Sequence, residues 1–230
     1  LAESPEHLEQ FDLLRDAMDK WLSASNDLGV VPETELDRFV PARQPTLTGP
    51  SGAKYTVSDT LEKAQIFGKP LRHWIGELNG DDVLRRYRAI ATIRLCTGDI
   101  NDLLTKAIED FDVCIAYWAA IGSGGPHRHA SYLSLMQSLE RYSTTIKLAA
   151  ARGLLNISSA HSTIAAQAAL DRMTDPNIFV RLAAAQILEL VGPMTEDIRA
   201  ALTRAKDDKS DPRDYVADVA RHALGLPPQH

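Results

Sequence analysis

Basic and aromatic side chains gather between residues 72 and 88, in a chain whose formal net charge is −6. The candidates for ligand contact are Arg72, Trp74, Arg85 and Arg88. An arginine guanidinium binds carboxylate, sulfate or phosphate oxygens in pairs, and an aromatic ring adds stacking contact. The composition therefore predicts a surface for an anionic ligand, with sulfated or carboxylated glycans as the class that suits it. In the alternative interpretation, Trp74 and Tyr87 belong to the core and the arginine stems lie over them.

Two polar clusters contain residue types that bind metal ions. His127 and His129 follow Gly124-Gly-Pro126, but two imidazoles at this spacing make only half of a tetrahedral site. The acidic candidates for a hard cation are Asp99, Asp102, Glu109, Asp110 and Asp112. Their spacing departs from the Asp-x-Asp-x-Asp-Gly calcium loop, which favours solvated helix faces instead. We therefore expect no metal and no cofactor in this chain.

The nucleophile candidates, Cys96 and Cys114, lack the neighbours that catalytic motifs require. Cys96 precedes Thr-Gly-Asp-Ile, and Cys114 precedes Ile-Ala-Tyr-Trp. The sequence also has no glycine-rich phosphate loop and no Gly-x-Ser-x-Gly turn. We expect the cysteines to be two buried free thiols, with a disulfide as the alternative. The sequence predicts no catalytic residue.

The elements that must hold these residues are indicated by a phrase that returns along the chain. It runs from Asp175 to Leu188 and recurs from Asp211 to Leu224, with looser copies upstream. The apolar anchors of the five copies are Leu84, Ile115, Ile146, Val180 and Val216, at spacings of 31, 31, 34 and 36 residues. A period of this size indicates stacked helix pairs, which build a surface rather than a catalytic pocket.

Each phrase predicts a helix with one apolar face. We expect Asp175 to accept hydrogen bonds from the first backbone N–H groups, and Pro176 suits the first helical position. Val180, Ala184 and Leu188, four residues apart, then share a face, and the small alanine lets a neighbouring helix approach closely. The stretch before each phrase supplies the partner helix.

The pattern resembles HEAT repeats over about residues 69–226. The family pattern, which opens Asp-Pro-x-x-x-Val-Arg-x-Ala-Ala and ends in a leucine, is present at 175–188, whereas the last copy has Ala217 in place of the arginine. Copies one to three lack the Asp-Pro, and among them Arg85 and Lys147 keep the basic residue. The resemblance implies an all-α fold, a HEAT-like α-solenoid of about five helix pairs. An irregular helical bundle is the alternative.

The first sixty residues do not share the repeat. Residues 5–25 have apolar side chains at three- and four-residue steps, which predicts an amphipathic helix. Its stripe comprises Leu8, Phe11, Leu14, Met18, Trp21 and Leu22. We expect an extended stretch from Pro32 on, and residues 40–58 have the proline and glycine content of a linker. Without an upstream partner, the stripe must fold back onto the repeats or bind another molecule.

This region resembles the C-terminal end of formylglycine-dependent sulfatases. The run from Leu14 to Trp21, the Asn26-Asp-Leu-Gly29 turn and the Val31-Pro-Glu33 tripeptide follow the order of that family's last helix, Asp-x-Gly turn and Ile-Pro-Glu-like tripeptide. Bacterial members similar to arylsulfatases and heparan sulfatases continue through a proline-rich connector into HEAT repeats with an Arg-Tyr-Trp-Ala-Ala phrase. Tyr117-Trp-Ala-Ala120 is similar to that phrase, with Ala116 in place of the arginine.

The resemblance implies that the catalytic apparatus belongs upstream. Such enzymes hydrolyse sulfate esters with a formylglycine made within Cys/Ser-x-Pro-x-Arg and with calcium on aspartate and asparagine oxygens. This chain contains neither motif. We therefore expect a piece of a longer protein, with calcium only in the parent enzyme. A sulfatase parent implies a periplasmic or secreted protein, whereas the residues alone leave the compartment unknown.

These patterns divide the chain into residues 1–33, the last helix and tail of a sulfatase-like domain, a Pro/Gly-rich connector over 34–58, and a HEAT-like repeat domain over 59–230. The expected function is a non-catalytic accessory module, with the upstream catalytic domain or a protein as partner and a sulfated glycan as a further ligand. A stand-alone HEAT-repeat interaction module is the alternative, and a HEAT-like bilin lyase is a third. The acidic charge argues against nucleic acid, and no apolar run reaches the roughly 18 residues of a membrane span.

Overall fold

The computed structural model describes residues 8–24, 28–39, 54–125, 132–141, 143–192, 194–210 and 212–227. The described residues are mostly helical, which confirms the all-α fold. The first described element is α1 (Leu8–Ala24), the helix expected from the apolar stripe. Two short 3-10 helices follow, η2 (Leu28–Val30) and η3 (Glu33–Phe39).

Residues 33–39 are therefore helical, and the expectation of an extended stretch after Pro32 is wrong. The turn closes locally, since the Glu35 N–H donates to the Pro32 carbonyl at 2.8 Å. The turn also allows Leu36 to pack against the buried core. Burial of this side chain explains why a segment bounded by a proline coils instead of extending.

The rest of the described chain is a series of helices with one small hairpin. The helices are α2 (Asp59–Glu62), α3 (Leu71–Leu78), α4 (Val83–Ile93), α5 (Asn101–Ile108), α6 (Val113–Ser123), α7 (Tyr132–Ser138), α8 (Thr144–Ile157), η6 (Ser159–His161), α9 (Ser162–Leu170), α10 (Ile178–Leu190), α11 (Glu196–Ala205) and α12 (Tyr215–Ala223). The antiparallel hairpin of β1 (Gln65–Ile66) and β2 (Lys69–Pro70) precedes α3. Its turn places Phe67 and Gly68 at φ values of 51° and 71°, as a two-residue hairpin turn requires.

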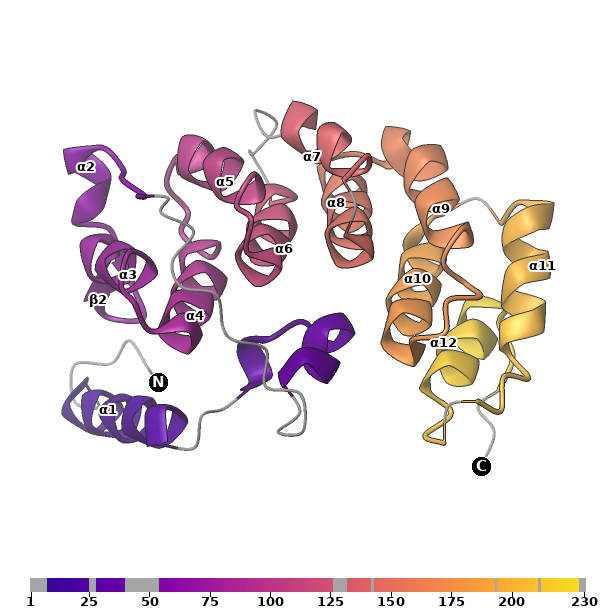
Figure 1. Ribbon diagram of the computed structural model, residues 1–230, viewed down its shortest axis with the longest axis horizontal. Coiled ribbons are helices and arrows are strands. Elements are labelled where there is room, and N and C mark those ends of the chain that lie inside the picture. The colour runs from indigo at the N-terminus through magenta and orange to yellow at the C-terminus, as the bar shows by residue number, and fades with distance from the viewer. Residues whose placement is uncertain are drawn as a thin grey trace.

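Consecutive helices pack in pairs, α3 on α4, α5 on α6, α7 on α8, α9 on α10 and α11 on α12. The second helices of the pairs also contact one another in order, from α4 through α6, α8 and α10 to α12. Figure 1 shows these pairs as a row, with α5, α7 and α9 along its upper edge. Five pairs in the described part of the chain agree with the number expected from the repeat spacing. No helix there is long and apolar enough to cross a membrane.

The anchor residues occupy equivalent places in the second helices. Ile115, Ile146, Val180 and Val216 are at most 5% exposed, and Leu84 packs against the core with partial burial. Ala184, between Val180 and Leu188 of α10, is fully buried, as close helix packing requires. The periodicity of the sequence therefore identified the buried face of each second helix correctly.

The start of α10 differs from the expectation. The helix begins at Ile178, and the capping residue is Asn177, whose side chain accepts a 2.9 Å hydrogen bond from the Phe179 N–H. The carbonyls of Asp175 and Pro176 instead bind the Arg181 guanidinium, which holds them in a turn before the helix. The Asp-Pro pair thus forms the turn that precedes the helix, two residues earlier than a cap.

Candidate functional site

The N-terminal part of the chain lies on one face of the helix row. We call this the inner face; it is formed by α4, α6, α8 and α10, and the short indigo pieces lie below it in Figure 1. The 3-10 helix η2 contacts α4, and η3 contacts α10. Val31 is 4% exposed, and Leu28, Val30 and Leu36 pack around it against the core. Residues 28–36, hereafter the docked segment, are therefore bound to the repeats by apolar contact.

Polar side chains from three helices fix the path of the docked segment. Trp118 of α6 donates its indole N–H to the Val30 carbonyl at 2.7 Å. Asn177, the cap of α10, donates its side-chain amide to the Thr34 carbonyl at 3.3 Å. Thr145, in the first turn of α8, has its hydroxyl 2.5 Å from a carboxylate oxygen of Glu35. Two backbone carbonyls and one acidic side chain of the segment are thus recognised.

The Glu35 carboxylate is 8% exposed and lies at the N-terminal end of α8. The unpaired backbone N–H groups of a first helical turn favour negative charge, which offsets part of the cost of this burial. The Thr145 hydroxyl also lies 2.8 Å from the Thr34 hydroxyl. Having one proton, it donates to the carboxylate and accepts from Thr34. A hollow of about 580 Å³, lined by Thr34, Glu35 and Arg141 among others, remains open beside the segment.

The acidic residues between α5 and α6, Asp110 and Asp112, have a structural role. The Asp110 carboxylate accepts a hydrogen bond from the Tyr55 hydroxyl. Burial is the main cause that raises the pKa of Tyr55, and this hydrogen bond is the second. Asp112 caps α6 through the Cys114 N–H at 3.0 Å and also accepts from the Tyr87 hydroxyl at 3.0 Å. Burial raises the pKa of Asp112 in spite of these bonds.

Metal-binding geometry is not formed by these acids. Within the described ranges, no group of three histidine, cysteine, aspartate or glutamate residues is placed to hold a metal ion. His127 and His129 lie outside the described residues. Cys96 and Cys114 are both buried free thiols, as expected.

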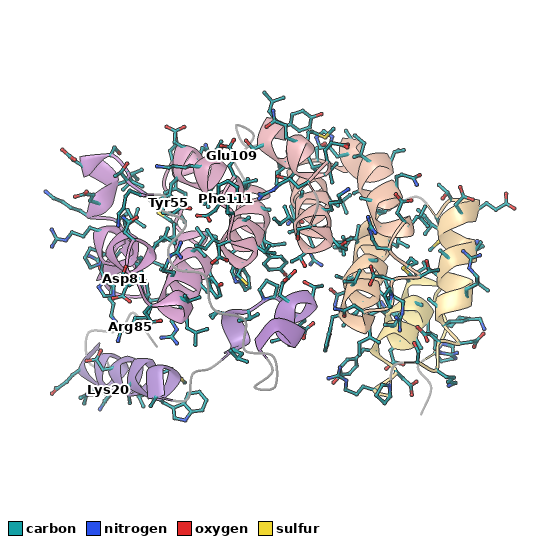
Figure 2. All side chains as sticks on the ribbon, viewed as in Figure 1. Lys20, Tyr55, Asp81, Arg85, Glu109 and Phe111 are labelled. Carbon is teal, nitrogen blue, oxygen red and sulfur yellow. The ribbon has the colours of Figure 1, made fainter. Side chains whose placement is uncertain are left out.

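The predicted anionic-ligand residues meet only in part. Trp74, Arg85 and Arg88 line a hollow of about 570 Å³ between α1, α3 and α4, together with Lys20, Lys69, His73 and Glu77. Arg72 is exposed on α3 and does not line the hollow. Figure 2 shows Lys20 of α1 opposite Arg85 of α4.

Trp74 is largely buried beside the hollow. Trp74 is 7% exposed, and its indole N–H donates to the Ile66 carbonyl at 3.2 Å. Its ring is therefore part of the core, although Trp74 also lines the hollow. Tyr87, at 4% exposure, is buried as well, so both aromatic residues belong to the core.

Sequence reasoning missed the docked segment and two cations of the hollow. One of these cations is Lys20, and nothing local in the sequence predicts that α1 approaches α3 and α4. One feature of the sequence could have indicated the binding of this segment. Thr145 and Asn177 are polar residues that both lie at the start of repeat helices on a shared face. That signal indicates a polar strip on the inner face, but it does not identify what binds there.

No protein-family model and no curated protein matches the chain. Function is therefore inferred from the geometry of the inner face and of the hollow, and from the order of the sequence motifs.

Proposed function

We propose that this chain is a non-catalytic interaction module in which a row of HEAT-like helix pairs binds a short peptide segment on its inner face. The docked segment carries this proposal, because α6, α8 and α10 each supply one hydrogen-bonding side chain to it. Two of the three hydrogen bonds go to backbone carbonyls, so the inner face recognises the backbone conformation of the segment. The third selects an acidic residue.

The module would be the accessory part of a sulfatase-like hydrolase. The Val31-Pro-Glu33 tripeptide, which contributes to the sulfatase resemblance, lies within the docked segment. By holding this tail, the repeats would fix the orientation of a catalytic domain that precedes it. The face of α1 supports the same arrangement, since Leu14, Met18 and Trp21 are 72%, 55% and 60% exposed and are not covered by the repeats. This stripe is where the upstream domain would pack.

Cleavage of the connector tests the binding of the docked segment. A protease site placed within residues 41–50 of the full chain allows the N-terminal fragment to be cut from the repeats after folding. We expect both fragments to elute together in gel filtration. Thr145→Val removes the donor to Glu35, and hydrogen bonds to charged groups contribute about 1.5–3 kcal/mol, so the fragment should dissociate at least about tenfold more readily.

Thr163→Val is the matched control, because Thr163 is exposed on α9, away from the segment. It should leave the elution unchanged. Separation of the fragments in the otherwise unaltered chain, or equal weakening by both threonine changes, would show that the inner face does not bind this segment.

The identity of the parent is tested by the coding sequence upstream of Leu1. A Cys/Ser-x-Pro-x-Arg motif and an aspartate-rich calcium motif there would support the sulfatase-like parent. A start codon at or just before Leu1 would exclude it and leave a stand-alone interaction module.

A further inference from the structure

The hollow between α1, α3 and α4 concentrates positive charge in an acidic protein. The described residues that line it include four cations, Lys20, Lys69, Arg85 and Arg88, and one acid, Glu77, which gives these residues a formal charge of +3. The whole chain has a net charge of −6. Like charges held close together raise the electrostatic energy unless an anion joins them. The local excess of cations therefore suits a negatively charged occupant.

Two of these cations have contacts within the chain, since Lys69 lies over the Trp74 ring and Arg85 has carboxylate partners. Arg85 pairs with Glu77 at 4.0 Å and with Asp82 at 3.7 Å, and its side chain is 53% exposed. Arg88 differs from Arg85 in its burial and hydrogen bonding. Its Nε atom is buried and makes no hydrogen bond to any described residue. An unpaired buried N–H costs free energy, and an anion bound beside Arg88 would supply an acceptor for it.

We propose that this hollow binds a compact ligand bearing sulfate or phosphate groups. Arg85 and Arg88, one turn apart on α4, carry guanidinium groups whose N–H donors suit tetrahedral oxyanions. Lys20 contributes a charge from α1 on the opposite side. A volume of about 570 Å³ is within the range of small-molecule sites, which run from roughly 300 to 1,000 Å³. Because Trp74 is buried, recognition depends on charge and not on stacking.

This site is separate from the docked segment and goes beyond the proposed interaction module. Its test is isothermal titration of the full chain with sucrose octasulfate and, separately, with inositol hexakisphosphate. Binding of either compound with one site per chain is expected. The compound that binds more tightly then distinguishes a sulfated from a phosphorylated ligand.

Variants locate the binding. Arg85→Gln combined with Arg88→Gln should weaken binding at least about tenfold, because two charge-assisted contacts are lost. Arg72→Gln removes the same kind of charge from the neighbouring exposed surface and should change the affinity less than about twofold. If the double variant does not fold, Lys20→Gln on the exposed helix α1 takes its place, with a loss of affinity expected.

Three results would overturn the proposal. The first is that neither compound binds. The second is that the Arg72 variant loses as much affinity as the double variant. The third is that a folded double variant, or the Lys20 variant in its place, binds as well as the unaltered chain. The second result would show attraction to the general surface, and the third would place the ligand elsewhere.

Discussion

Arg181 shows how one side chain connects successive parts of the row. Its guanidinium is buried, donates to the Asp175 carbonyl at 2.6 Å and pairs with the Asp208 carboxylate at 3.0 Å. The arginine belongs to the repeat pattern and was expected from the sequence. Its partner was not, because Asp208 lies in the turn between α11 and α12 and not in the repeated phrase. A residue type can be predicted from a pattern, whereas its contact requires the path of the next turn.

Replacing Arg181 with methionine should lower the free energy of unfolding by about 2–4 kcal/mol, since Asp208 and two carbonyls lose a charged donor. Urea denaturation followed by circular dichroism measures the change. Arg204→Met, on the exposed face of α11, is the control and should stay within about 0.5 kcal/mol. A loss of less than 1 kcal/mol on replacing Arg181 would contradict a structural role.

The Asp208 carboxyl predicts a specific dependence of stability on pH. Burial raises its pKa, but hydrogen bonds from Ser210 and the charge of Arg181 outweigh this effect and hold the pKa below its usual range. The folded state therefore binds this proton less tightly than the unfolded state does. Its stabilising contribution is present above the unfolded pKa of about 3.9 and is lost as the pH falls through the folded pKa.

Asp208→Asn should accordingly be less stable than the unaltered chain at pH 7, and the difference should shrink as the pH falls below about 4. Urea midpoints at several pH values measure it. A difference that stays constant, or grows, at acidic pH would show that the native pKa of Asp208 is not lowered.

At the scale of elements, α6 and α8 approach each other at two glycines. A Cβ atom on Gly153 would lie 2.7 Å from the Ala120 carbonyl oxygen, and one on Gly124 would lie 2.7 Å from Gly153 itself. The abundance of alanine in the repeats predicts close packing of helices. It does not predict which position is closest, because this depends on where the two helix axes cross.

Gly153→Ala should destabilise the fold by about 1–3 kcal/mol, since the added methyl group meets backbone that cannot move freely. Gly76→Ala is the opposite control, because Gly76 lies within α3 and has open space around its Cβ position. It should stabilise the fold by about 0.5–1 kcal/mol through the higher helix propensity of alanine. Equal effects of the two changes would contradict the packing of α6 on α8.

At the scale of the molecule, the sequence predicts the helix pairs better than it predicts their contacts with residues 28–36. The five pairs and their anchors are local patterns repeated along the chain. The docked segment depends on contacts such as Trp118 to Val30 and Asn177 to Thr34, which join residues 88 and 143 positions apart. The basic hollow is a similar case, since Arg85 and Arg88 lie in one helix whereas Lys20 comes from α1. Distant pairings of this kind have no local signature.

The three tryptophan indole N–H groups provide the most direct test of the bound segment. Trp118 donates to the docked segment, Trp74 donates within the core, and Trp21 is 60% exposed on α1. Hydrogen exchange of these groups by NMR should be slow for Trp74 and Trp118 and fast for Trp21. Val31→Asp places a charge in the buried part of the segment and should release it, so that Trp118 exchanges quickly while Trp74 stays slow. If Trp118 exchanges as fast as Trp21 in the unaltered chain, or stays slow in the Val31 variant, the inner face does not hold this segment.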